Sequence, residues 1–285
     1  MTSLEPKLIQ PLIENALSED IGSGDISALS IAFHAKAQAK IIAKQDGIFS
    51  GGQLAQQLFH HLDPNMEIDL LKDEGEAFSN GEILIQLAGN GEAILMGERT
   101  ALNFLGRMCG IATLTNQYVK QTAGTKSKIL DTRKTLPGLR LLDKYAVVCG
   151  GGFNHRFGLY DMILIKENHI RYVGSLERAI QKALDFKNHQ NRQWKIEVEV
   201  TSLDEFRRAA AFPIQRIMLD HFSLDMTKQA VAQRPAHISI EFSGNVTPEQ
   251  VAAIAATGVD YISAGALTHS APSADLSLLF RQKQS

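Results

Sequence analysis

The second half of the chain alternates short apolar runs with longer amphipathic segments, and this pattern limits the possible folds more than any other feature of the sequence. The runs, rich in β-branched or aliphatic residues, are KILD, MILIK, KIEVEV, RIMLD, ISIEF and YISAG. Segments with helical spacing separate them, as over 175–187, 224–232 and 247–257. Strands that alternate with helices build parallel βα units. Six units without a dinucleotide-binding glycine pattern favour an α/β barrel over an open sheet.

The residues before Glu92 have a different pattern, in which helices and strands are mixed. We expect an opening helix around 12–17, with Pro11 in its first turn, that ends at the glycines of 22–24. Period-two alternation predicts strands over 37–43, 66–70 and 83–87, and helical spacing predicts a helix over 54–62. Long helical stripes over 92–123 follow, and we place the junction between two domains there.

Composition excludes several classes of protein. The chain has 285 residues, 44% hydrophobic and 21% charged, which excludes a disordered protein and suits two domains. Its net charge of -2 leaves no basic excess for nucleic acid or an anionic membrane. No apolar stretch approaches the ~18 residues of a membrane span and no signal-like segment opens the sequence, so we expect a cytoplasmic protein. Cys109 and Cys149, the only cysteines, are predicted to be reduced core thiols.

Polar residues gather where each predicted strand ends, which is the catalytic end of a barrel. In chain order they are Thr132, Arg133, Lys134 and Thr135; Lys166, Glu167, Asn168 and His169; Glu197 and Glu199; Asp220; Glu241, Ser243, Gly244 and Asn245; and Ser263, Ala264 and Gly265. Arg140, Lys144, His155 and Arg156 add to the cationic segment between Asp131 and Arg171. Arginine grips carboxylates and phosphates with a planar fork, whereas lysine supplies a compact charge for phosphate. The segment therefore predicts an anionic ligand with both groups; the roles of Arg140 and Lys144 stay open.

Two loops and two carboxylates extend this prediction. Ser243-Gly244-Asn245 and Gly265-Ala266 follow the last two predicted strands, where backbone N–H groups can cradle a phosphate. Glu199 and Asp220, near the ends of adjacent predicted strands, are placed to hold Mg²⁺ through water or to bind ribose hydroxyls. A structural ion pair with nearby cations is the alternative. Glu197 points the same way as Glu199 by period two, so the sequence does not separate them.

Lys166, His155 and His269 have more than one interpretation. Lys166 fits phosphate binding, but a barrel lysine can also form a Schiff base with a carbonyl substrate. His155 is a proton donor, an orienting partner for a carboxylate or a core histidine, and we favour orientation. His269, which follows the second loop, is expected to support the phosphate site.

Together these motifs resemble the quinolinate phosphoribosyltransferases. The resemblance rests on GERTALNFLGRMCGIAT, on DTRKTLPGLRLLDKYAVVCGGGFNHRFGLYDMILIKENH, and on EVEV, MLDHF, EFSGNV and SAGALTHSAP, with ALSEDIGSGDIS near the start. It covers nearly the whole chain. It implies an N-terminal open α/β sandwich over 1–109, an incomplete α/β barrel over 110–271 and a C-terminal helix over 272–285 that packs back on the first domain. It also implies a homodimer, or a hexamer built from dimers.

The resemblance assigns roles to particular residues. Four would hold the two carboxylates of quinolinate: Arg99, donated by the partner subunit, and Arg133, His155 and Arg156. Lys134 and Lys166 would lie where quinolinate meets phosphoribosyl pyrophosphate and its diphosphate. Glu199 and Asp220 would serve the ribose and Mg²⁺. The 5-phosphate would be bound or supported by Ser243, Gly244, Asn245, Gly265 and His269.

The implied reaction needs no protein nucleophile. The quinolinate nitrogen attacks the anomeric carbon as diphosphate leaves, and the alkylated ring then accepts the electrons of the departing carboxylate as CO₂. The product is nicotinate mononucleotide, within de novo NAD biosynthesis. The alternatives are a paralogue of the same fold, ModD-like or using nicotinate, a Schiff-base lyase that uses Lys166, and a non-catalytic module that binds a phosphate ligand.

Overall fold

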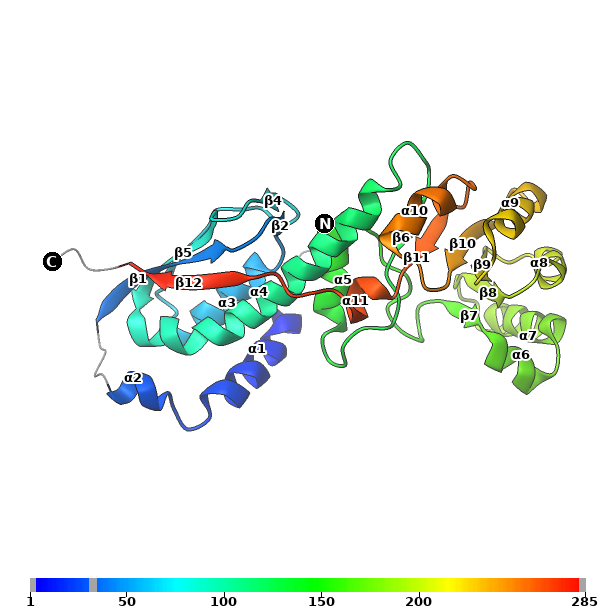
Figure 1. Ribbon diagram of the computed structural model, residues 1–285. Coiled ribbons are helices and arrows are strands. Elements are labelled where there is room, and N and C mark those ends of the chain that lie inside the picture. The colour runs from blue at the N-terminus through cyan, green and yellow to red at the C-terminus, as the bar shows by residue number, and fades with distance from the viewer. Residues whose placement is uncertain (1–3, 31–34, 282–285) are drawn as a thin grey trace. The chain divides into compact units, whose positions relative to one another are not determined.

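The computed structural model describes residues 4–30 and 35–281, and the chain divides into two compact units (Figure 1). The first unit comprises Met1–Asn116, Leu136–Gly151 and Ser270–Ser285, and the second comprises Gln117–Thr135 and Gly152–His269. The division therefore falls later than residue 109, inside a long helix, and the segment 136–151 belongs to the first unit although it lies between two strands of the second.

The first unit contains a four-stranded antiparallel sheet in the order β12-β1-β5-β3. Its strands are β1 (Lys36–Ala43), β3 (Glu67–Leu70), β5 (Ile83–Asn90) and β12 (Leu276–Phe280), and β2 (Gly47–Ile48) pairs separately with β4 (Ala77–Phe78). The strands predicted from period-two alternation are confirmed. The predicted helix over 272–285 is wrong where the structure describes it, and 282–285 lie outside the described residues.

The strand β12 forms because the free edge of β1 offers it hydrogen-bonding groups. Ala39 is level with Phe280, and Ala43 is level with Leu276, in an antiparallel ladder. Leu276 and Leu278 are buried with the period of a strand, so the segment gains both a ladder and an apolar face. In Figure 1 the red arrow of β12 lies beside the blue arrow of β1.

The helices of the first unit bury regularly spaced apolar residues. They are α1 (Pro6–Ile21), α2 (Ile26–Ser30), α3 (Gly52–Leu62), α4 (Gly91–Lys120, which ends in the second unit) and α5 (Arg140–Cys149). The spacing of Ile9, Ile13 and Leu17 places one apolar stripe of α1 in the core. Contrary to prediction, Pro11 lies inside this helix, which begins at Pro6, the first-turn proline. Cys109 and Cys149 are free and buried as predicted, and burial raises the pKa of each thiol to about 12.

The second unit contains a six-stranded parallel sheet in the order β6-β11-β10-β9-β8-β7. Its strands are β6 (Lys128–Leu130), β7 (Ile163–Ile165), β8 (Ile196–Val200), β9 (Arg216–Asp220), β10 (Ser239–Ser243) and β11 (Tyr261–Ser263). The chain order runs around the sheet as in a barrel, with the open seam between β6 and β7. This confirms the predicted incomplete α/β barrel.

The helices of this unit follow the strands in the predicted alternation. They are α6 (Glu167–Val173), α7 (Leu176–His189), α8 (Leu203–Ala210), α9 (Leu224–Gln233), α10 (Pro248–Ala255) and α11 (Ala266–His269). Helix α8 contacts both β8 and β9, where Val198 and Ile217 are fully buried. This face of the sheet is apolar, so the polar strand residues must lie on the other face. Across both units, none of the described helices is long and apolar enough to cross a membrane.

Candidate functional site

The polar strand residues of the second unit share one face of the sheet, at three successive levels. The ladder register places Glu197 with Arg216, then Glu199 with Met218 and Glu241, then Asp220 with Ser243. Residues that are level on neighbouring parallel strands point the same way, and the direction repeats every second residue. The third level is nearest the carboxyl ends of the strands, where a barrel binds its substrates.

Three residues near the carboxyl ends of the strands are partly exposed, and we call Lys166, Glu199 and Asp220 the open cluster. Their side chains are 44%, 13% and 29% exposed, respectively. The ammonium of Lys166 forms an ion pair with Oε2 of Glu199. A Schiff-base lysine needs a free amine, so this ion pair disfavours the lyase alternative. The backbone N–H of Lys166 donates to Nδ1 of His169, 3.0 Å away, and fixes the start of α6.

The guanidinium groups of Arg133 and Arg156 lie close enough for their charges to repel each other. Burial lowers the pKa of Arg156, and the charge of Arg133 lowers it further, whereas Glu197 and Asp161 raise it. Nη1 of Arg156 donates to the carbonyl oxygen of Met162 at 3.3 Å. Arg133 is exposed and makes no ion pair within the described residues. Like charges brought together favour an anion between them, as the sequence predicts.

A side chain in place of glycine would meet close neighbours at both predicted phosphate loops. Gly244 has φ +117°, and a Cβ there would lie 2.8 Å from Nδ1 of His221. At Gly265 a Cβ would lie 2.8 Å from Cδ of Lys134 and 3.2 Å from Nε2 of His269. The structure therefore brings the predicted residues Lys134, Gly265 and His269 together. Thr268 supports them, since its hydroxyl donates to the carbonyl oxygen of Lys134 at 2.8 Å.

His221 lies against one of these loops, although the sequence did not predict it as a site residue. Its ring packs against Gly244, its backbone has φ 55°, and its N–H donates to the carbonyl oxygen of Ser243 at 3.0 Å. The signal was present, because His221 directly follows Asp220 at a strand end. Asn245, with φ 44°, also has a left-handed backbone, which asparagine tolerates better than most residues.

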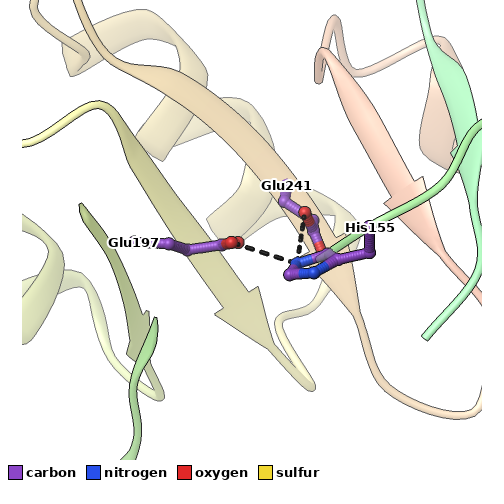
Figure 2. A group of neighbouring side chains, drawn as sticks. All are labelled: His155, Glu197 and Glu241. Carbon is purple, nitrogen blue, oxygen red and sulfur yellow. Dashed lines mark ion pairs between the residues drawn. The ribbon is translucent and has the colours of Figure 1, made fainter. Parts of the chain in front are cut away.

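His155 is buried, and both of its ring nitrogens face protein atoms. Nδ1 accepts the backbone N–H of Arg156 at 2.7 Å. Nε2 lies 3.0 Å from Oε2 of Glu197 and 3.5 Å from Oε2 of Glu241 (Figure 2). These contacts support an orienting role within the protein. A contact between His155 and a bound carboxylate stays a prediction.

We call His155, Glu197, Arg216 and Glu241 the buried cluster. Both carboxylates are 0% exposed, and the side chain of Arg216 is only 12% exposed. Nη1 of Arg216 lies 2.8 Å from Oε2 of Glu241 and 3.9 Å from Oε2 of Glu197. Burial raises the pKa of each glutamate to about 7, and the charge of Glu197 adds to the shift at Glu241.

This geometry separates Glu197 from Glu199, which the sequence could not do. Both point to the same face, but Glu197 lies one level deeper and contacts other protein charges. The ligand atoms of His155, Glu197 and Glu241 lie within 4.8 Å of one another, as in a metal site. Arg216 already supplies a cation to this group, so a divalent ion would meet its repulsion.

Three basic residues considered from the sequence lie in the first unit. Arg99 is exposed on α4. Arg140 is half-buried and Lys144 is buried, and both lie on α5. The second unit contains the other predicted site residues, Arg133, Lys134, His155, Arg156, Lys166, Glu199, Asp220, Ser243, Gly244, Asn245, Gly265 and His269. Arg99 is therefore outside the unit that forms the site.

Comparisons with known proteins agree with this architecture. Residues 25–109 match the model of the N-terminal domain of quinolinate phosphoribosyl transferase, and residues 111–279 match that of the C-terminal domain. A Bacillus subtilis protein named "probable nicotinate-nucleotide pyrophosphorylase [carboxylating]" is 43% identical over 95% of this chain and 92% of its own. The Arabidopsis thaliana chloroplastic nicotinate-nucleotide pyrophosphorylase [carboxylating] is 39% identical over 95% of this chain and 82% of its own.

Solved structures give the same result. The nicotinate-nucleotide pyrophosphorylase from Francisella tularensis is 41% identical, with a TM-score of 0.93 and 98% of each chain covered. A protein of the same name from Ehrlichia chaffeensis is 34% identical, with a TM-score of 0.91 over 99% of this chain and 100% of the other. Both domain models match in chain order, and the relatives align over nearly full length. The chain therefore belongs to the quinolinate phosphoribosyltransferase family.

Proposed function

We propose that this protein transfers the phosphoribosyl group of phosphoribosyl pyrophosphate to the nitrogen of quinolinate and releases CO₂ and diphosphate. The product is nicotinate mononucleotide, a step of de novo NAD biosynthesis. One observation carries the proposal: two neighbouring arginines, a lysine–glutamate pair and two glycine loops meet near the carboxyl ends of the strands, in a chain of this family.

Recognition of quinolinate follows from the two arginines. Quinolinate is a planar dicarboxylate, and guanidinium groups bind carboxylates through paired, charge-assisted hydrogen bonds. Burial and, after it, the charge of Arg133 lower the pKa of Arg156, and an anion between the two guanidinium groups would offset their repulsion. These residues hold the ring so that its nitrogen faces the anomeric carbon of the second substrate.

Recognition of phosphoribosyl pyrophosphate follows from the lysines and the loops. Lys134 lies against Gly265 and His269, and the 5-phosphate fits between this group and the backbone of 243–245. Lys166 and Lys134 lie toward the diphosphate and offset the negative charge that grows on it as the glycosidic bond breaks. Glu199 and Asp220 accept hydrogen bonds from the ribose hydroxyls.

The open cluster also fits a magnesium ion. Glu199 and Asp220 provide hard carboxylate oxygens on one face of neighbouring strands, and both are accessible to water. Mg²⁺ keeps several waters and is held by one or two carboxylates and substrate phosphates, which suits this donor set. When bound, Mg²⁺ would neutralise charge on the diphosphate leaving group.

Loss of CO₂ needs no further cofactor. Once its nitrogen is alkylated, the pyridine ring is cationic, so the bond to the adjacent carboxylate can break and leave its electron pair on the ring carbon as CO₂ departs. A proton from water then adds to that carbon and gives nicotinate mononucleotide. The arginines that hold the carboxylates keep the ring in place during this step.

We further propose that the enzyme works as a homodimer, or as a hexamer of dimers, in which Arg99 enters the site of the partner subunit. The family resemblance and the exposed position of Arg99 on α4 support this arrangement. The cytoplasmic location stays a prediction.

Product analysis tests the proposed function. The protein is incubated with Mg²⁺, phosphoribosyl pyrophosphate and quinolinate, and a parallel tube contains nicotinate in place of quinolinate. We expect nicotinate mononucleotide and CO₂ from quinolinate alone. Turnover of nicotinate alone would assign the protein to a nicotinate-using paralogue, and turnover of neither acid would reject the proposed reaction.

A further inference from the structure

The two arginines proposed to hold quinolinate lie on different segments at the open seam of the barrel. Arg133 follows β6, and Arg156 lies in the segment that leads to β7. Since β6 and β7 are the two edge strands of the sheet, no ladder runs directly between them. The distance between the two guanidinium groups therefore depends on contacts between these two segments.

Backbone pairing brings the two segments together. Phe153 forms a parallel bridge with Leu130, the last residue of β6. The N–H of Phe153 donates to the carbonyl oxygen of Ile129 at 2.8 Å, and its carbonyl oxygen accepts the N–H of Asp131 at 3.1 Å. The pairing reaches Phe153, which is three residues before Arg156. The residues between them need a different support.

The side chain of Asp131 supplies this support. Its carboxylate is fully buried. Oδ1 accepts the backbone N–H of His155 at 2.8 Å, and Oδ2 accepts a side-chain N–H of Asn154 at 2.6 Å. Hydrogen bonds to a carboxylate are stronger than those between neutral groups. Asp131 is two residues before Arg133, and His155 directly precedes Arg156, so one carboxylate links the backbone beside both arginines.

The backbone after Arg156 is held by a second carboxylate. Asp161 accepts the N–H of Phe157 at 2.6 Å and the N–H of Gly158 at 3.1 Å. The guanidinium of Arg156 donates to the carbonyl oxygen of Met162 at 3.3 Å, which closes the segment on itself. Arg156 is therefore fixed within its own segment, and Asp131 fixes that segment against β6.

The segment that contains Arg133 is fixed in a similar way. The hydroxyl of Thr132 accepts the N–H of Lys134 at 3.0 Å and forms a tight turn around Arg133. The carbonyl oxygen of Lys134 accepts from the hydroxyl of Thr268 at 2.8 Å. Each arginine thus has a fixed local backbone, and the connection through Asp131 joins the two.

We propose that Asp131 is a positioning residue that sets the distance between the guanidinium groups of Arg133 and Arg156, and that this distance selects anions with carboxylates on neighbouring ring carbons. Asp131 acts through the backbone and does not touch the ligand. The proposal rests on the proposed function for the identity of the ligand, since quinolinate has its two carboxylates on neighbouring carbons.

Two benzene dicarboxylates test this selection without any reaction, because they lack the ring nitrogen that accepts the phosphoribosyl group. Phthalate has its carboxylates on neighbouring carbons, and isophthalate has one carbon between them. Calorimetric titration measures the affinity of the protein for each. The ratio of the two affinities does not depend on the fraction of the protein that is folded. We expect the wild type to bind phthalate about thirtyfold more tightly than isophthalate.

Exchanging the two side chains at positions 131 and 154 tests the role of Asp131. In Asp131→Asn one acceptor oxygen remains, so the N–H of His155 or that of Asn154 loses its partner, and we expect the preference for phthalate to fall to about threefold. Asn154→Asp sets two carboxylates against each other and should have a similar effect. The double variant restores both hydrogen bonds with one donor and acceptor reversed, and its preference should return to within about threefold of the wild type.

Asp260→Asn is a matched control in the same sheet. Asp260 precedes β11, the neighbour of β6, and so lies at the opposite end of the strands from Asp131. Its carboxylate accepts the N–H of Ile240 at 2.8 Å and pairs with Lys126 and Arg234. We expect this substitution to lower Tm and to leave the preference for phthalate unchanged.

Several outcomes would overturn the proposal: equal affinity of the wild type for the two isomers, an unchanged preference in Asp131→Asn, no recovery in the double variant, or an equal loss of preference in Asp260→Asn. Failure of the proposed function would look different. If the affinities followed the expected pattern but the wild type formed no product from quinolinate, the proposed function would fail while the positioning role of Asp131 would stand.

Discussion

The buried cluster and the open cluster lie on the same face of one sheet, yet the charged groups of the first are paired inside the protein and those of the second are partly exposed to water. In the buried cluster Arg216 contacts two fully buried glutamates, and His155 completes the group. In the open cluster Lys166 pairs with Glu199 but is 44% exposed, and Asp220 is 29% exposed. Residue type does not distinguish the two groups, since each has a cation and two acids. Burial distinguishes them, since Glu241 is level with Glu199 in the sheet but is 0% exposed, whereas Glu199 is 13% exposed.

The difference follows from the cost of removing charge from water. In the buried cluster an unpaired charge would cost several kcal/mol, so each charged group is matched by another protein group. In the open cluster water hydrates part of each side chain, so a charged group there loses little free energy when no ligand is bound. The buried cluster should therefore control stability and geometry, and the open cluster should control binding and chemistry.

The largest expected effect comes from the cation of the buried cluster. Arg216→Met leaves Glu197 and Glu241 buried without their guanidinium partner, and we expect a loss of about 3–5 kcal/mol in the free energy of unfolding. Chemical denaturation measures it. Lys166→Met is the matched control in the open cluster and should change stability by less than about 1 kcal/mol. Equal destabilisation by both substitutions would remove the distinction between the clusters.

Loss of an arginine at the ligand should affect binding and not folding. We expect Arg156→Ala or Arg133→Ala to weaken quinolinate binding by about 100-fold or more, because a charge-assisted bidentate contact is lost. Calorimetric titration measures the affinity, and Tm should stay close to that of the wild type. Unchanged affinity in both variants would refute the assignment of these arginines.

The acids of the open cluster should matter for turnover. We expect Glu199→Gln and Asp220→Asn to lower kcat about 10–100-fold and to raise the Mg²⁺ concentration needed for half-maximal rate, with little change in stability. Steady-state kinetics across a Mg²⁺ series, with thermal unfolding alongside, measures both. A normal rate and metal requirement in both variants would assign these carboxylates a structural role.

The pH dependence of stability should report the buried cluster. Burial raises the pKa of Glu241 to about 7 from its ordinary value of 4.5, and the charge of Glu197 adds to the shift. The folded state then binds more protons than the unfolded chain across this range. The resulting stabilisation is complete below pH 4.5 and is lost as the pH rises through about 7.

For each proton bound in this way, the free energy of unfolding falls by at most about 1.4 kcal/mol per pH unit. Denaturation series at several pH values between 5 and 8 measure this slope. Glu241→Gln should make it shallower because one of the two glutamates no longer titrates. The same slope in the wild type and the variant would show that Glu241 does not titrate here.

The smallest effect is expected for an exposed ion pair of the same unit. Arg171 and Glu167 lie 2.6 Å apart on α6, with side chains 73% and 62% exposed. We expect Arg171→Ala to change the free energy of unfolding by less than about 0.5 kcal/mol and to leave kcat unchanged. A loss comparable to that of Arg216→Met would show that burial does not set the cost of losing a cation.

Most of the barrel could be predicted because each strand run is short, apolar and followed by polar residues. The register could not be predicted, and the register separates Glu197 from Glu199 by depth. The C-terminal segment was misjudged for a related reason. Leu276 and Leu278 form a strand because the edge of β1 is available to them, and no local pattern reveals that edge.

The sequence by itself determined the alternation of strands and helices, the cations after the strands, and the family to which the chain belongs. These follow from local spacing and residue type, which act between near neighbours in the chain. Only the tertiary structure decided which charged side chains are buried in pairs and which stay partly exposed, where a ligand can bind them. It joined His155 to Glu197 and Glu241, and it set His221 against Gly244, because such contacts depend on the register and depth of strands that lie far apart in the sequence.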